Sequence, residues 1–178
     1  PVLSARVVDA ALARAGIDPA RVDDVYLGCG NHWNTQSYNL GRLTVHASKL
    51  PNTVAGFVMD RKCSSGLNAI ALAANYVRND GAEVVVAGGV ESLSFPGGGG
   101  SMQNNDPKLA QQYPAIFMPM IDTADIVAER YKISREYQDE YSLESQRRMA
   151  AAQQANKFAD EIVPMKTKMK VVDKATKA

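Results

Sequence analysis

The sequence has few cysteines and no run of apolar residues long enough to cross a membrane. Its 178 residues include two cysteines, Cys29 and Cys63, which are too few for a disulfide framework. A membrane-spanning helix needs roughly 20 consecutive apolar residues, and no stretch approaches that length. The sequence also lacks an Asn-x-Ser/Thr glycosylation site and a secretory signal pattern. These absences favour an intracellular, reducing compartment.

An excess of charge of either sign is also lacking. The formal net charge is +1, which argues against a nucleic acid or an anionic membrane surface as the partner. Hydrophobic residues make up 46% of the chain, enough for a core, and the length suggests one domain or slightly more. The chain opens at Pro1 instead of Met, already within a helical pattern, and ends abruptly. We therefore expect a fragment of a longer protein.

Segments with helical and strand patterns alternate along the chain, which predicts the α/β class. We expect helices over residues 2–16, 39–49, 67–78, 122–131 and 134–155, and strands over 25–28, 53–59, 83–91 and 161–163. The strand at 83–91 is continuously apolar and is predicted to be buried on both faces. Residues 94–120 are rich in glycine and proline, including four glycines at 97–100, and form a long excursion with a flexible hinge.

The most informative residue is Cys63, which lies between an apolar strand pattern and the helix that begins near Leu67. Ser64 and Ser65 are predicted to cap that helix by accepting hydrogen bonds from its first N–H groups. The helix dipole favours a thiolate at this end. The helix is apolar on nearly every side, so we expect it to be buried and to hold Cys63 at the floor of a pocket. The alternative is a buried structural cysteine.

Two segments carry a family resemblance. Residues 61–67, Arg-Lys-Cys-Ser-Ser-Gly-Leu, followed by residues 84–92, Val-Val-Val-Ala-Gly-Gly-Val-Glu-Ser, resemble the first half of a thiolase, an acetyl-CoA C-acyltransferase. Further matching segments follow in the family's order over residues 1 to about 168, at positions 123–124, 128–131, 133–136, 138–140 and 160–164.

The resemblance implies a thiolase fold, of which this chain supplies the N-terminal half. In that fold a mixed sheet lies between helical layers and is followed by part of the loop domain. The core is expected at residues 1–93, without its first strand. Loop excursion and helices are expected at 94–159. The last strand of the half and the start of a further loop segment are expected at 160–178.

The implied reaction is cleavage of 3-oxoacyl-CoA by CoA to acetyl-CoA and a shortened acyl-CoA, or the reverse condensation, as in fatty-acid β-oxidation. Cys63 is the implied nucleophile of a ping-pong mechanism, because a thiol can both attack carbon and leave as thiolate. Thiolases also use a histidine from a Gly-His-Pro motif and a cysteine from a Cys-x-Gly-Gly-Gly motif. Neither motif occurs in this chain, so we expect residues 1–178 alone to be inactive.

Other residues receive supporting roles. Glycines near the reacting centre let backbone approach it closely, and Glu91 is predicted to be a buried, hydrogen-bonded brace instead of a general base. Structural support of the site is expected from Ser64, Gly66, Gly88, Gly89 and Glu91. Apolar residues of the excursion are expected to bind substrate or contact a subunit, namely Phe117, Met118 and Met120.

The resemblance further implies CoA and acyl-CoA as ligands, a homodimer or homotetramer, and no cofactor other than CoA as a substrate. It implies a cytoplasmic enzyme, or one of the mitochondrial matrix or peroxisome in a eukaryote. No metal is expected, because a zinc set of Cys29, His32, His46 and Cys63 lacks a second closely spaced ligand pair. The lysines beyond residue 165 favour a solvated surface over a site for CoA phosphates.

Two alternatives to a thiolase stay open. One is a condensing enzyme of the same superfamily that resembles 3-oxoacyl carrier-protein synthase, which also has a Cys-Ser-Ser step at a helix start. The other is a non-catalytic module that binds acyl-CoA or lipid.

Overall fold

The computed structural model describes residues 1–93 and 105–168. Contacts divide the chain into two compact units, Pro1–Met102 and Gln103–Ala178. The first unit contains α1 (Val2–Ala15), β1 (Asp24–Gly28), α2 (Leu40–Ala47), β2 (Ala55–Met59), α3 (Ser65–Asn79) and β3 (Val85–Gly89). The second contains α4 (Pro107–Gln112), α5 (Met120–Arg130) and α6 (Arg135–Gln154). The predicted α/β class is confirmed.

Short-range signals in the sequence explain where the helices of the first unit begin and end. Gly16 ends α1 with a φ of 66°, a left-handed conformation that glycine adopts without steric cost. The side chain of Asn39 caps α2 by accepting a hydrogen bond from the Arg42 N–H group at 3.0 Å. The helices expected at 2–16 and 39–49 are therefore found, within one or two residues of their predicted ends.

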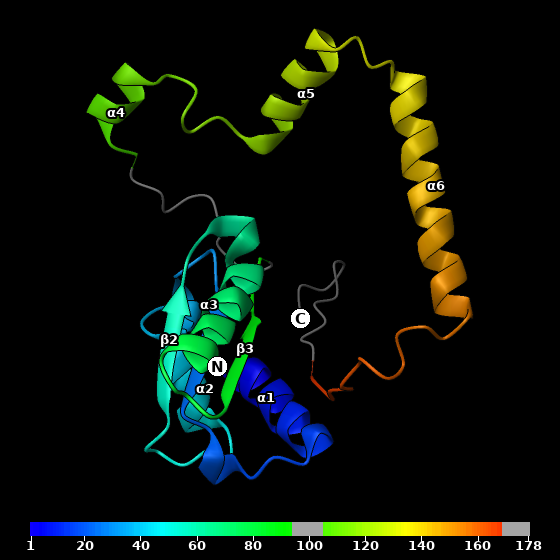
Figure 1. Ribbon diagram of the computed structural model, residues 1–178. Coiled ribbons are helices and arrows are strands. Elements are labelled where there is room, and N and C mark those ends of the chain that lie inside the picture. Colours follow the sequence, from blue (N-terminus) through cyan, green and yellow to red (C-terminus); the bar gives the residue numbers. More distant parts are fainter. Residues whose placement is uncertain (94–104, 169–178) are drawn as a thin grey trace, which may run out of the picture. The chain divides into compact units, whose positions relative to one another are not determined.

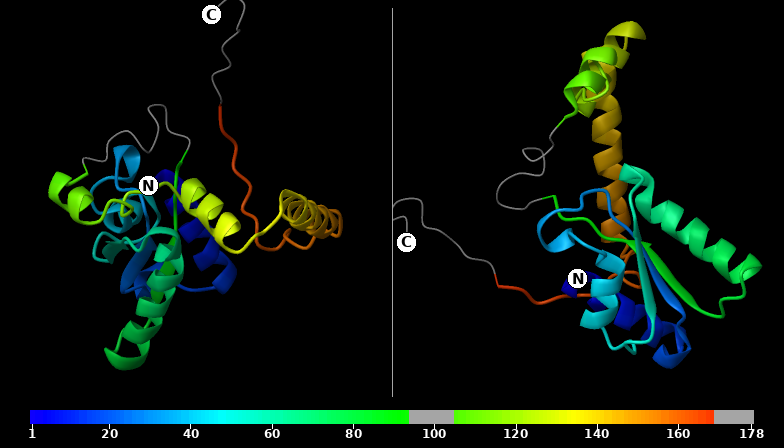
Figure 2. Two further views of the ribbon diagram at one scale, coloured as in Figure 1. Left: turned by 90° about the horizontal axis from the view of Figure 1, so that it is seen from above. Right: turned by 90° about the vertical axis from the view of Figure 1, so that its left-hand side faces the viewer.

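The strands of the first unit form a parallel sheet in the order β2-β1-β3 in the part of the chain that the structure describes, where a mixed sheet was expected. Helix α3 covers one face of this sheet, and α1 and α2 cover the other (Figures 1 and 2). Residues at the carboxyl ends of the strands lie side by side, since Gly28 pairs with Met59 on one side and with Gly89 on the other. In parallel α/β sheets this is the edge at which ligands bind.

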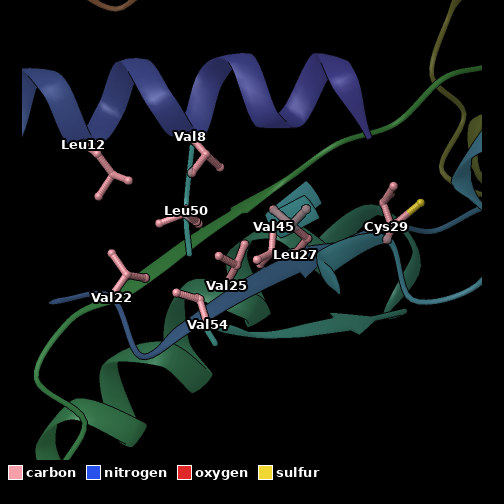
Figure 3. Packing of buried hydrophobic residues seen from close by; sticks show 10 residues of the cluster. Val8, Leu12, Val22, Val25, Leu27, Cys29, Val45, Leu50 and Val54 are labelled. Atoms are coloured by element: carbon pink, nitrogen blue, oxygen red, sulfur yellow. The ribbon is translucent and has the colours of Figure 1, made fainter. Parts of the chain in front are cut away.

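The hydrophobic core lies between the sheet and α1 and α2. Val25 and Leu27 of β1 are buried there, with Val8 and Leu12 of α1 packed over them (Figure 3). On the opposite face of β1 the ring of Tyr26 lies 4.9 Å from that of Phe57 and 5.9 Å from that of Tyr76, a residue of α3. Successive side chains of a strand point to opposite faces of the sheet, so those of β1 alternate between the layer of α1 and α2 and the layer of α3.

Helix α3 is less buried than its composition predicts. Its contact face consists of small residues, Ser65, Ala69 and Ala73, which let its backbone approach the sheet closely. The larger residues point away, and Leu67 is 73% and Ile70 51% exposed. Within the first unit, the small residues of α3 face the sheet and its bulky apolar residues stay exposed.

Two strand predictions also differ from the structure. β3 is half-buried instead of buried on both faces, because it lies at an edge of the described sheet. Residues 161–163 form no strand, because the Glu161 and Ile162 N–H groups donate to the Phe158 carbonyl oxygen in a turn. The helices expected at 122–131 and 134–155 are confirmed as α5 and α6. Within the described ranges, no helix is both long and apolar enough to cross a membrane.

Candidate active site

Cys63 lies at the carboxyl edge of the sheet, in the 3₁₀ turn Lys62–Ser64 that leads directly into α3. It lines a cavity of about 420 Å³ whose walls also include Lys62, Gly66, Gly89 and Glu91. The thiol is exposed, in accordance with its position in the wall of this cavity. The turns that follow β1, β2 and β3 all contribute to the lining, so the sheet register creates this site.

Cys29 differs from Cys63 in burial. It follows β1, is 1% exposed and belongs to the hydrophobic core (Figure 3). Burial raises the pKa of the Cys29 thiol. A backbone hydrogen bond with Asn31 opposes this rise, and the nearby Glu91 carboxylate adds to it. Cys29 is therefore a poor nucleophile in this fold, and Cys63 is the accessible thiol.

The two serines after Cys63 do not cap α3 in the predicted way. Ser64 occupies the N-cap position, but its Oγ donates to the Arg61 carbonyl oxygen at 2.9 Å. The buried Ser65 Oγ donates to the Lys62 carbonyl oxygen at 2.6 Å and accepts from the Arg61 N–H group at 2.8 Å. Both hydroxyl groups therefore fasten the turn that precedes the helix. The tight 3₁₀ geometry at Lys62–Ser64 brings these upstream backbone groups within reach.

Close backbone approach occurs at Gly28, Gly66 and Gly89. A Cβ atom on Gly28 would lie 2.2 Å from the Ser65 carbonyl carbon, and one on Gly89 would lie 3.1 Å from the Gly66 Cα atom. Among the described residues, no atom lies within 4 Å of a Cβ atom built on Gly88. The expectation missed Gly28, although its place at a strand end next to Cys29-Gly30 was a signal for a tight turn.

Glu91 is hydrogen-bonded as a brace would be, but it is exposed and not buried. Its carboxylate accepts from the Gly30 N–H group at 2.7 Å and from the Gln36 side-chain amide at 3.0 Å. The Gln36 side-chain oxygen in turn accepts from the Ser92 N–H group at 2.6 Å. This arrangement ties the loop after β1 to the end of β3. Gln36 was not predicted, because nothing local in a polar loop marks a residue that contacts a distant strand.

The candidate substrate-binding residues belong to the second unit. Phe117 and Met120 are exposed there, and Met118 is partly buried. Met120 lines a cavity of about 350 Å³, together with residues of α5 and Ile133 and Gln138 after it. The four glycines at 97–100 and the lysines beyond residue 168 lie outside the described residues.

The histidines do not join the cysteines in a metal site. His46 Nδ1 lies 3.2 Å from the side-chain oxygen of Asn52 on the surface. Among the described residues, no group of three or more His, Cys, Asp or Glu side chains is arranged to hold a metal ion.

Comparisons with known proteins agree on one family. The family model described as "Thiolase, N-terminal domain" matches residues 2–178. The chain is 36% identical over 172 residues to the β-ketoadipyl-CoA thiolase of Pseudomonas knackmussii, an alignment that covers 86% of this chain and 42% of that protein. It is 37% identical over 163 residues to the 3-ketoacyl-CoA thiolase of Bacillus subtilis, covering 92% of this chain and 42% of the relative.

A solved structure matches this chain in both sequence and fold. The crystal structure of the acetyl-CoA acetyltransferase of Bacillus anthracis matches with a TM-score of 0.79 and 35% sequence identity, covering 96% of this chain and 46% of the other. The chain therefore spans less than half the length of the relatives it matches. The matches in sequence and in fold cover nearly all of its residues, and the chain belongs to the thiolase family.

Proposed function

We propose that this chain supplies the nucleophilic cysteine of an acetyl-CoA C-acyltransferase. The reaction is the cleavage of 3-oxoacyl-CoA by CoA, or the reverse condensation, through an acyl-enzyme on Cys63. The observation that carries this proposal is the exposed Cys63 thiol in the cavity at the carboxyl ends of the parallel strands. Membership of the thiolase family supports it, because the related proteins are named as thiolases and as an acetyl-CoA acetyltransferase.

The chemistry requires two transfers. The Cys63 sulfur attacks the 3-keto carbon, the bond between C2 and C3 breaks, and its electron pair leaves on C2. Protonation of C2 gives acetyl-CoA, and the shortened acyl group stays on sulfur as a thioester. CoA then loses its thiol proton, which balances the proton taken up by C2, and its thiolate attacks this thioester carbonyl and releases Cys63. The first step converts a ketone into a thioester on Cys63, and the second exchanges that thioester for acyl-CoA, which suits a thiol that is both a nucleophile and a good leaving group.

We also propose a substrate class, substrate-binding residues, an assembly and a location for the enzyme. The substrate class is 3-oxoacyl-CoA, since the names of the relatives include both 3-ketoacyl-CoA and β-ketoadipyl-CoA. We assign substrate contacts to Phe117, Met118 and Met120, and support of the nucleophile to Ser64, Gly66, Gly88, Gly89 and Glu91. The working enzyme is a homodimer or homotetramer of the cytoplasm, or of an organelle in a eukaryote, and uses CoA as a substrate with no further cofactor. Residues 1–178 alone are inactive.

Mass spectrometry of the full-length protein tests the nucleophile. After incubation with acetoacetyl-CoA we expect an acetyl group on Cys63, and Cys63→Ser should abolish both the adduct and turnover. Cys29→Ala is the matched control and should keep the adduct, because Cys29 lies in the core. An acyl group found on Cys29 alone would contradict the assignment. Transfer from the acyl-enzyme to an acyl carrier protein in preference to CoA would support a condensing enzyme instead. Binding of acyl-CoA without any adduct would support a non-catalytic module.

A further inference from the structure

Lys62, the residue before Cys63, has an unusual backbone conformation. Its φ is 49°, in the left-handed region that side chains other than glycine seldom adopt. Such a conformation costs energy, so it persists only where surrounding contacts hold it in place. It is found most often at functional turns. The contacts of Lys62 show which groups impose it.

Asp60 holds Lys62 at two points. Its Oδ1 accepts from the Lys62 backbone N–H group at 2.7 Å, and its Oδ2 accepts from the Lys62 ammonium group at 2.5 Å. The ammonium group also donates to the Gly30 carbonyl oxygen at 2.9 Å. Asp60 follows β2 and Gly30 follows β1. The Asp60, Lys62 and Gly30 contacts, here called the Lys62 clamp, therefore join the ends of two neighbouring strands.

The clamp is continuous with the brace at the third strand. Gly30 donates its N–H group to Glu91 Oε2 at 2.7 Å while its carbonyl oxygen accepts from Lys62. A Cβ atom on Gly30 would lie 3.2 Å from Glu91 Oε2 and 3.4 Å from the Lys62 Cα atom. Glycine at this position thus lets the three loops meet. Cys63 is the next residue along the chain and lines the same cavity as Lys62, Gly30 and Glu91.

The ion pair between Lys62 and Asp60 is too exposed to contribute much to the stability of the whole protein. The Lys62 side chain is 70% exposed, and exposed ion pairs contribute little to global stability. Partial burial alone would raise the pKa of Asp60, but the hydrogen bonds and charge of Lys62 outweigh this effect and hold the pKa below its usual value. The carboxylate therefore stays ionised at neutral pH. The consequence of the clamp is local, at the turn that carries the thiol.

We infer that Asp60 and Lys62 are positioning residues that hold the Cys63 turn in its left-handed conformation and aim the thiol into the cavity. This inference rests on the proposed role of Cys63 as the acyl acceptor. Neither residue is assigned a contact with substrate. Since a displacement of about 1 Å can slow a reaction by about 100-fold, loss of the clamp should lower the rate constant of acylation.

The test uses the full-length protein and four variants. Lys62→Met removes the ammonium group and keeps the aliphatic stem, Lys62→Arg keeps a cation, and Asp60→Asn removes the negative charge. The fourth combines Asp60→Asn with Lys62→Met. Lys49→Met, which removes an exposed lysine between α2 and β2 at the opposite edge of the sheet, is the matched control. The measurements are the rate constant of Cys63 acylation by acetoacetyl-CoA, the KM, and the amide hydrogen exchange of residues 60–64.

We expect Lys62→Met and Asp60→Asn each to slow acylation by about tenfold or more with KM unchanged. The double variant should be no slower than the slower single variant, because both changes remove one clamp. Exchange at residues 60–64 should rise, Lys62→Arg should restore most of the rate, and Lys49→Met should match the wild type. Faster exchange with unchanged acylation, or no change in either, would overturn the positioning role.

A failure of the proposed function would look different. In that case wild-type Cys63 would take up no acyl group from acetoacetyl-CoA. The structural effect of the Lys62 clamp is then tested by amide hydrogen exchange at residues 60–64 and by the rate of Cys63 alkylation with iodoacetamide. Unchanged exchange and alkylation in Lys62→Met would overturn the clamp, whereas changes in both would support it.

Discussion

Gly28 is the residue at which the site has least room for a side chain. The nearest atoms to its missing Cβ are the carbonyl carbon of Ser65, at 2.2 Å, and the nitrogen of Gly66, at 2.4 Å. Both are backbone atoms in the first turn of α3, so a new methyl group cannot be accommodated by a side-chain rotation. The end of β1 and the start of α3 would have to separate, and Cys63 lies two residues before that helix start.

We therefore predict that Gly28→Ala lowers the free energy of unfolding by about 1–3 kcal/mol, as overpacking of a dense contact does. Gly88→Ala is the control, because its Cβ would contact none of the described residues, and its effect should stay within about 0.5 kcal/mol. Urea denaturation of the full-length variants, followed by circular dichroism, measures both. Equal stabilities for the two variants would show that α3 does not press against Gly28.

The starts of α2 and α3 differ in how their first N–H groups are satisfied. At α2, Asn39 accepts from the Arg42 N–H group and its amide also donates to the Gly56 carbonyl oxygen at 2.7 Å. One side chain thus caps the helix and joins it to β2. At α3, the Ser64 hydroxyl group turns back to the Arg61 carbonyl oxygen and makes no capping bond.

This difference gives opposite expectations for two similar substitutions. Asn39→Ala should lower stability by about 1 kcal/mol or somewhat more, because a cap and a contact with β2 are lost together. Ser64→Ala should cost less than about 0.5 kcal/mol, since its hydroxyl group is exposed and no helix N–H depends on it. The thermal unfolding midpoints of the two variants, measured in one buffer, compare the two losses of stability. A larger loss for Ser64→Ala would contradict the hydrogen bonding described for this turn.

Across the whole molecule, apolar side chains remain uncovered in both units. Leu67 and Ile70 lie on the outer face of α3, and Phe117 and Met120 are exposed in the second unit. Exposed apolar surface of this kind marks interaction sites in soluble proteins. The family relatives are longer than this chain, so both further segments of the full-length protein and a second copy are available to cover such surfaces.

We predict that the full-length protein is at least a homodimer. Light scattering at low micromolar concentration should give a mass of two or four chains, and dilution should not produce an active species of smaller mass. The same sample is assayed for thiolysis, so that mass and activity refer to one state. A monomer with full activity would contradict the prediction.

Much of the fold follows from short-range patterns in the sequence. The left-handed glycine at position 16 and the cap at Asn39 act over one helical turn, so they could be identified from neighbouring residues alone. The joint between a strand and a helix at Cys63 follows from two apolar runs that flank it, and the structure has that joint. The segments that resemble thiolases, taken in their order along the chain, predicted the thiolase family, and the comparisons confirm it.

What the sequence did not reveal depends on residues far apart in the chain. The strand order β2-β1-β3, the approach of Gly28 to α3, and the bonds from Gln36 and Gly30 to Glu91 arise when parallel strands bring their carboxyl ends together. The Lys62 clamp is partly of this kind, because Asp60 is near in sequence but Gly30 is not. Local propensity acts over about four residues, whereas these contacts are set by packing between elements, and packing determines which wall of the site each residue forms.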